Sequence, residues 1–337
     1  MKIQHWLKFL TVLFTIASCS HSKKDVDVSD VKINFQFHRF EQDLFAMDKN
    51  AIATELPQMR KKYGNFFERF NENMIQIGNS SRADYPVNIS NFLNDAAIIA
   101  VYKDVQKEYS NTDALQEDFE SALKHYKYYF PDKVIPQVAT FISGFNYPIA
   151  VTDSLMGVGL DMYLGKKYNY YQLMAFPNYQ TEFMSKNYVV VDAMRSWLQT
   201  EFETMDAHNN LLSEMIFQGK IMYALDYILP QFPDTIKMEY TNKQLQWTQN
   251  SETSIWKYFI DKKLLYSTKP SENVKYINAA PFTTGMPKES PSRIGVWVGW
   301  KIVEAYMEKN SSITIADLMN EKDAQKILNA SHYKPKK

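Results

Sequence analysis

The sequence predicts an α+β fold: a predominantly helical single domain that carries a small antiparallel sheet. Over most of the chain, apolar residues recur every three or four positions, which is the periodicity of amphipathic helices. Three short runs between residues 138 and 164 alternate in hydrophobicity instead, as half-buried strands do. No linker-like stretch interrupts residues 31–330, so we expect one folded unit.

The first residues have the organisation of a secretory signal. A basic start is followed by an apolar run at residues 9–16, which is too short for a spanning helix of roughly 20 residues. The small pair Ala17-Ser18 directly precedes Cys19, the only cysteine of the 337 residues, and this arrangement resembles the bacterial lipobox. We therefore interpret residues 1–18 as a lipoprotein signal peptide and Cys19 as the lipidated first residue of the mature chain. The alternative is an ordinary signal peptide with a chance cysteine.

The mature chain is expected to be anchored to a membrane without crossing it. Residues 19–30 are polar and form the predicted tether, and residues 31–337 form the predicted ectodomain, in which no apolar run is long enough to span a bilayer. Once Cys19 is acylated, no thiol remains for a disulfide, for thiolate catalysis or for a cysteine metal site. Because 38 basic residues balance 38 acidic ones, net charge predicts no nucleic-acid partner.

The N-terminal half is expected to contain one strand, then helices, then the sheet. Ile33, Phe35 and Phe37 alternate with polar residues and predict a strand that leads into a helix near residues 40–47. Further apolar stripes predict helices at residues 51–77, 91–109 and 113–130. The alternating runs predict strands at residues 138–143, 149–151 and 158–164.

The C-terminal half is expected to be helical. The predicted helices cover residues 189–206, 211–229, 241–266 and 291–310, with a short pair at the end. Ser290 and Pro291 are placed as the N-cap and first residue of the fourth helix. Gly219 lies among large apolar residues, and Gly295 and Gly299 are four positions apart. Since a glycine in a helix costs up to about 1 kcal/mol relative to alanine, these positions predict close helix packing.

No established catalytic motif is present in the sequence. None of the six histidines has another four positions later, and the chain has neither a Gly-rich phosphate loop nor a Gly-x-Ser-x-Gly elbow. Among the acids, Asp161 is expected to face solvent, Asp192 to favour a helix N-terminus, and Asp226 to pair with a buried Lys or Arg. We therefore predict no catalytic residue, no metal site and no cofactor. A cleft in which these acids converge would favour an enzyme.

Several long strings carry a resemblance to one family, the gliding-motility lipoprotein GldB family. They recur in order over nearly the whole chain, at residues 141–145, 159–165, 215–223, 255–260, 265–268, 290–300 and 333–337. The resemblance implies a lipid-anchored protein of the cell envelope, facing the periplasm, that is required for bacterial gliding motility. It implies as partners the membrane and other envelope proteins of the gliding and secretion machinery. Inner and outer membrane both remain open.

Three functions are compatible with this resemblance. We favour a non-catalytic component or scaffold of the gliding and secretion machinery, because no catalytic constellation is recognisable in the sequence. The alternatives are a divergent envelope peptidase and a glycan-binding ectodomain. Glycan binding would require aromatic side chains exposed in a groove, whereas most of the aromatic residues lie on helical stripes that are typical of a core.

A more distant similarity concerns the helices at residues 189–206 and 211–229. They resemble the active-site pair of zincin peptidases, in which a His-Glu-x-x-His helix precedes a helix with a Glu-Gly pair. Asp192 and Ser196 lie on the first helix at the spacing of the two histidines, and Gln218 stands at the Glu position before Gly219. A neutral amide is a poor zinc ligand. The similarity therefore implies a degenerate zincin-like scaffold, a pseudoenzyme.

Overall fold

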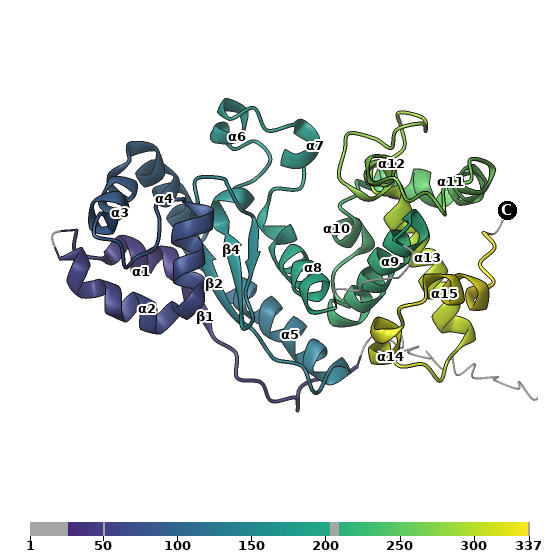
Figure 1. The fold of residues 1–337 in the computed structure, drawn as a ribbon, viewed down its shortest axis with the longest axis horizontal. Coiled ribbons are helices and arrows are strands. Elements are labelled where there is room, and N and C mark those ends of the chain that lie inside the picture. The colour runs from purple at the N-terminus through teal and green to yellow at the C-terminus, as the bar shows by residue number, and fades with distance from the viewer. Residues whose placement is uncertain (1–25, 50, 203–208, 336–337) are drawn as a thin grey trace, which may run out of the picture.

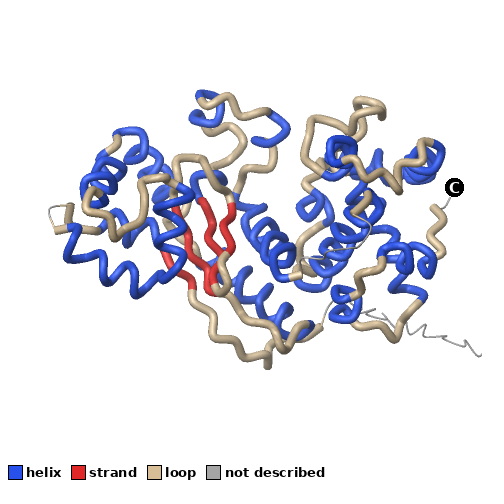
Figure 2. The backbone as a smooth tube through the Cα atoms, in the orientation of Figure 1, coloured by secondary structure: helices blue, strands red, loops and turns tan. Residues whose placement is uncertain are grey.

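The structure is a computed structural model that describes residues 26–49, 51–202 and 209–335. Helices predominate, and a small sheet lies between two groups of helices (Figure 1, Figure 2). The predicted combination of many helices and a small sheet is confirmed. In the described part of the chain, no helix is long and apolar enough to cross a membrane. The signal peptide, Cys19 and most of the tether lie outside the described residues.

The sheet has four strands in the order β1-β2-β4-β3. They are β1 (Phe37–Arg39), β2 (Gln137–Phe141), β3 (Ile149–Val151) and β4 (Leu155–Gly159). β1 pairs with β2 and β2 with β4 in parallel, and only β3 and β4 are antiparallel. The predicted antiparallel sheet was therefore wrong. Alternation of side chains shows that a strand has two faces, but it does not show which strand lies beside it or in which direction.

The first and the last of the predicted strands in the sequence were misplaced. Only Phe37 of the first alternating run belongs to β1, which continues to Arg39. The run at residues 158–164 is mostly not a strand, because β4 ends at Gly159 and Leu160–Tyr163 form a 3-10 turn. The glycines of β4 allow close packing: a Cβ on Gly157 would lie 2.5 Å from the Phe66 ring.

Five helices connect β1 to β2, and the first four form one end of the molecule (Figure 1). They are α1 (Phe40–Ala46), α2 (Ile52–Arg69), α3 (Tyr85–Asn94), α4 (Ala96–Glu108) and α5 (Asp113–Tyr129). The predicted helix at 51–77 bends at Gly64, which has a φ of +50°, and finishes in a π-helical turn at Phe70–Met74. The predicted helix at 91–109 is two helices. Asp95 separates them and caps α4 by accepting hydrogen bonds from the N–H groups of Ala97 and Ile98.

The remaining helices form the other end of the molecule and an arm between the two ends. The short helices α6 (Asn169–Leu173) and α7 (Asn178–Thr181) lie on the arm (Figure 1). They are followed by α8 (Val189–Glu201), α9 (Leu211–Ile228), α10 (Asp234–Met238), α11 (Asn242–Asp261), α12 (Pro270–Ile277), α13 (Ile294–Lys309), α14 (Ile315–Asn320) and α15 (Ala324–Ser331). Ser290 and Pro291 precede α13 without capping it, since Arg293 occupies the N-cap.

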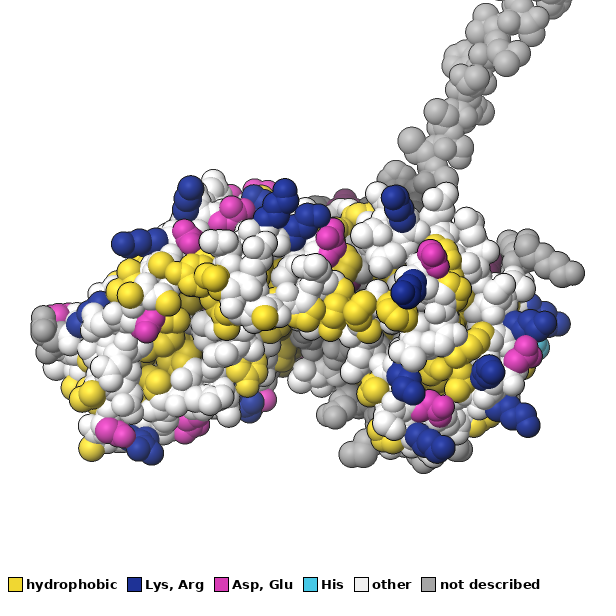
Figure 3. Space-filling model, turned by 90° about the horizontal axis from the view of Figure 1, so that it is seen from above, with side chains coloured by type: hydrophobic (Ala, Val, Ile, Leu, Met, Phe, Trp, Pro, Cys, Tyr) yellow, Lys and Arg dark blue, Asp and Glu magenta, His cyan; other side chains and the backbone are white. Residues whose placement is uncertain are grey.

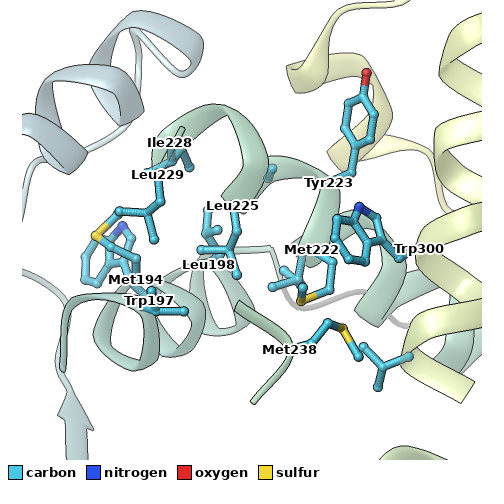
Figure 4. Close-up of a cluster of buried hydrophobic side chains, with 14 of the residues drawn as sticks. Met194, Trp197, Leu198, Met222, Tyr223, Leu225, Ile228, Leu229, Met238 and Trp300 are labelled. Atoms are coloured by element: carbon cyan, nitrogen blue, oxygen red, sulfur yellow. The ribbon is translucent and has the colours of Figure 1, made fainter. Parts of the chain in front are cut away.

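Two hydrophobic cores cover the two faces of the sheet. In β2, Ala139 and Phe141 face a smaller core built from aliphatic and aromatic residues of α1, α2 and α3, and Val138 faces the main core. The main core continues through α8, α9 and α13. Figure 4 shows side chains of α8 facing those of α9, with Trp300 of α13 on the far side of α9.

The close contact predicted from the glycines is confirmed where α9 crosses α13. A Cβ on Gly219 would lie 2.3 Å from the backbone of Gly299, and one on Gly299 would lie 1.8 Å from the carbonyl oxygen of Met215. Only hydrogen in place of a side chain lets the two backbones approach this closely. This contact fixes α9 relative to α13 and, through α9, supports α8.

Candidate functional site

A pocket of about 780 Å³ lies where α7, the start of β3, α8, the start of α11 and the loop before α13 meet. Its volume is in the range typical of ligand-binding cavities. Phe176, Tyr179 and Phe183 contribute aromatic rings, and Gln199 and Gln244 contribute amides. From above, hydrophobic side chains form an irregular band across the middle of this face of the molecule (Figure 3). The pocket therefore offers both apolar and hydrogen-bonding surface to a ligand.

Four charged side chains that line the pocket, Asp192, Arg195, Glu239 and Arg293, form what we call the ionic cluster. Arg195 Nη1 lies 3.0 Å from Asp192 Oδ1 and also donates to Glu239, and Arg293 Nη1 lies 3.2 Å from Glu239 Oε1. The arginine side chains are 10% exposed and the two carboxylate side chains 20% exposed. Each carboxylate thus has at least one guanidinium partner, and the cluster keeps limited contact with water.

The pKa values of the two carboxyl groups in the ionic cluster are shifted in opposite directions. Burial, reinforced by the nearby negative charge of Glu239, raises the pKa of Asp192 to about 7. Burial acts in the same direction on Glu239, but Arg195 and Arg293 outweigh it and lower the pKa of that carboxyl. The Tyr163 hydroxyl donates to Asp192 Oδ2 at 3.0 Å. Near neutral pH the cluster therefore contains one carboxylate, one carboxyl group that is partly protonated, and two guanidinium groups.

The backbone at two members of the cluster is in the left-handed region. Glu239, at the C-terminus of α10, has a φ of 55°, and Arg293, at the N-terminus of α13, has a φ of 58°. A residue with a side chain is less stable there than in the right-handed region by roughly 1–2 kcal/mol. Such strain is concentrated at functional sites. Six other described residues that are not glycine also have a positive φ, so these two positions support the candidate site together with the pocket and the ionic cluster.

The structure brings two of the three zincin-like positions to the pocket. Asp192 and Ser196, one turn apart on α8, both line it. Gln218, on α9, does not line the pocket. It contacts Gln199, which does: Gln218 Oε1 accepts a hydrogen bond from Gln199 Nε2 at 2.9 Å. Among the described residues, no group of three or more His, Cys, Asp or Glu side chains could hold a metal ion. The zincin-like scaffold remains a hypothesis.

The other two acids singled out in the sequence lie outside the pocket. Asp161 was expected to face solvent, and that prediction was wrong: its side chain is fully buried, and Oδ2 accepts hydrogen bonds from the N–H groups of Ser143 (3.0 Å) and Phe145 (2.7 Å). Burial raises the pKa of Asp161 to about 6 in spite of these bonds. Asp226 pairs with the buried Lys237, as predicted. The three acids do not converge in one cleft.

Glu239 and Arg293 were missed because they carry no local signal. Glu239 follows a helix of five residues, and Arg293 lies in a loop sequence whose apolar periodicity begins only at Ile294. Their partners are at least 44 positions away in the sequence, as Arg195 and Glu239 show. A positive φ at a residue other than glycine is a property of the folded chain, and no feature of the sequence predicted it.

Comparison with known proteins identifies one family. The family model described as gliding motility protein GldB, a lipoprotein family, matches residues 21–335. No curated protein and no solved structure gives a significant match.

Proposed function

Because the chain belongs to the GldB family of gliding motility lipoproteins, we propose that it acts in gliding as a non-catalytic scaffold at the cell envelope. In this proposal a lipid on Cys19 holds the protein at a membrane, and the folded part contacts other envelope proteins of the gliding and secretion machinery. Its contribution to motility is the position and orientation that it gives to those partners.

The observation that carries the non-catalytic part of the proposal is the internal pairing of the ionic cluster. A catalytic carboxylate must present its oxygens to a reacting group. Glu239 instead contacts two guanidinium groups, and Asp192 contacts Arg195 and Tyr163. These contacts occupy the two acids of the ionic cluster, so they support a structural role for both.

One observation favours the alternative of a divergent envelope peptidase. Asp192 and Glu239 line the same pocket, and their pKa values are shifted in opposite directions, a pattern that enzymes use to separate an acid from a base. The two proposals differ in a measurable way. A peptidase that depends on these acids would cleave a peptide library, and the replacement of either acid would end the cleavage.

The test of the scaffold proposal combines the anchor with the identification of partners. In intact cells, chemical crosslinking and mass spectrometry should recover envelope proteins of the gliding or secretion machinery with the wild-type chain. With Cys19→Ser we expect loss of acylation, loss of the protein from the membrane fraction and loss of gliding, because several acyl chains make a lasting anchor at about 0.8 kcal/mol per buried CH₂.

Ser20→Ala is the matched control for the anchor, since it changes the neighbouring residue and keeps the acylated cysteine. Cells with this variant should glide normally. Normal gliding by a Cys19→Ser protein that is shown to be unacylated would contradict the proposed anchor. Recovery of no envelope protein by crosslinking would contradict the scaffold.

A further inference from the structure

The β3 strand has an unpaired edge. It is the last strand of the sheet and pairs only with β4. The Pro148 carbonyl accepts from the Gly159 N–H at 2.8 Å, and the Thr152 N–H donates to the Leu155 carbonyl at 2.9 Å. Because backbone groups of an antiparallel strand alternate in direction, the N–H and C=O groups of Ile149 and Val151 point away from β4. The described part of the chain supplies them with no hydrogen-bond partner.

This edge borders the pocket. Pro148 and Ile149 both line it, and α8, which packs against β3 and β4, supplies the adjoining wall. An unpaired strand edge beside a pocket is the arrangement that binds extended peptides: the backbone of the peptide adds a strand, and alternate side chains enter the pocket. The aromatic and amide side chains of the pocket suit the mixed surface of a peptide.

The ionic cluster determines which charge the pocket favours. With both acids of the cluster ionised, two negative and two positive groups cancel, and a proton on Asp192 leaves the cluster with one net positive charge. Glu182 also lines the pocket, and its charge is balanced by Lys166, whose Nζ lies 3.2 Å from Glu182 Oε1. Arg293, 8% exposed, makes its ion pair and its hydrogen bond with the described residues through Nη1, which lies 3.2 Å from Glu239 Oε1 and donates to the Met238 carbonyl at 3.3 Å. Its Nε and Nη2 groups can therefore donate to a ligand. Arg195 Nε is also buried without a partner.

We propose that the pocket binds an extended, acidic peptide segment of a partner protein. The segment pairs with the outward backbone groups of Ile149 on β3, and one of its carboxylates accepts hydrogen bonds from Arg293. This inference rests on the proposed scaffold function, because it supplies the contact through which the scaffold holds a partner. Charge complementarity distinguishes this occupant from a basic or neutral segment.

The pocket lies on the side of the molecule away from the tether. Residues 26–36 run along the lower edge in Figure 1, whereas α6 and α7 lie at the upper edge. Val26 follows Cys19 by seven positions, which span at most about 25 Å when the chain is extended. The anchor therefore keeps the lower edge near its membrane, and the partner segment reaches the pocket from the opposite side.

The test uses the full-length, lipid-anchored protein in detergent and a library of random heptapeptides as the probe. We expect the enriched peptides to carry at least one acidic residue. For the best of them, fluorescence anisotropy then compares three forms: the parent, a form with alternate backbone amides N-methylated, and a form with each acid replaced by its amide. Each change should weaken binding by about tenfold or more, because it removes the backbone pairing or the charged contact.

Two variants test the same contacts from the protein side. Ile149→Pro removes one outward N–H and keeps the bonds of β3 to β4, so it should weaken binding by about tenfold. Arg293→Gln should weaken binding of the acidic peptide and leave binding of its amide form unchanged. Ile260→Gln, at an exposed position near the other end of α11, is the control and should bind like the wild type.

Three results would overturn the inference: no enriched peptide, enrichment of basic peptides, or equal binding of the N-methylated form to the wild-type protein. The last comparison does not depend on the folding of any variant. If a bound peptide is cleaved, the non-catalytic scaffold fails while the pocket assignment stands. If no peptide binds but crosslinks form on other surfaces, the scaffold stands and the pocket assignment fails.

Discussion

The contact between α9 and α13 and the ionic cluster of the pocket are both largely buried, but they are built in different ways. At the helix contact, Gly219 and Gly299 bring two backbones together and leave no room for a side chain. At the pocket, four charged residues contact one another beside a cavity of about 780 Å³. The helix contact has no space for an added side-chain atom, whereas the ionic cluster borders a cavity that can hold a ligand. We infer that one region fixes the fold and that the other is available for binding.

The largest effect is expected at the helix contact. Gly299→Ala places a Cβ against the Met215 carbonyl oxygen, which is backbone and cannot move aside as a flexible side chain could. We expect a loss of about 3 kcal/mol or more in the free energy of unfolding, measured by urea denaturation. Gly295→Ala is the matched control on the same helix. Its Cβ would lie 3.0 Å from the Tyr276 carbonyl oxygen, so the loss should be smaller. Equal losses would contradict the packing account.

This contact also shows how much of the fold could be predicted from the sequence. Glycines among large apolar residues, together with helical periodicity, indicated that α9 and α13 each pack tightly against a neighbour, because both signals are local. The sequence did not indicate that they pack against each other. The pairing of β1 with β2 joins residues about 100 positions apart, as Phe37 and Val138 show, and no local pattern specifies it. In the pocket, too, only the local signal was recognised. Asp192 and Ser196 were identified from the pattern of one helix, whereas Glu239 and Arg293 come from other elements and were missed.

Asp161 shows why the environment of a single acid is hard to predict. The alternation of its neighbours suggested a solvent-facing position on a strand. The chain turns after Gly159 instead, and the carboxylate accepts two backbone N–H groups inside the fold. A buried carboxylate of this kind satisfies backbone groups of a loop that is distant in the sequence, so only the three-dimensional arrangement reveals it.

A second prediction concerns the ionic cluster itself. Arg195→Met keeps the aliphatic stem but leaves Asp192 without a guanidinium partner and Glu239 with only Arg293. We expect a loss of about 2 kcal/mol in the free energy of unfolding, less than for a fully enclosed pair, because the carboxylate side chains remain 20% exposed. The measurement is urea denaturation at pH 7.

Lys124→Met provides the comparison for Arg195→Met. It breaks the ion pair with Glu120 on the surface of α5 and should change the stability by less than about 0.5 kcal/mol. If Arg195→Met has as little effect as this surface variant, the cluster does not contribute to the fold as described.

A smaller effect is expected from pH. Because the pKa of Asp192 is raised from 3.8 to about 7, the folded state binds a proton that the unfolded state has lost between these values. Stability should therefore fall as the pH rises from about 4 to 7. Asp161, with a pKa of about 6, acts in the same direction over the lower part of this range. In the Asp192→Asn variant, the free energy of unfolding should decrease less between pH 6 and 7 than it does in the wild type. The free energy of unfolding at pH 5, 6 and 7 measures this, and an unchanged slope would contradict the assigned pKa.

The central claim is that the pocket acids hold the structure together and break no bond. The most direct test is the gliding speed of cells that carry Asp192→Asn in place of the wild-type chain, with the amount of folded protein at the membrane measured alongside. The asparagine keeps an oxygen for the Tyr163 hydroxyl and resembles the protonated acid. We expect gliding at the wild-type speed. Cells that stop gliding although Asp192→Asn protein is present, folded and anchored in normal amounts would show that the ionisable acid is needed for more than the fold, and would contradict the account.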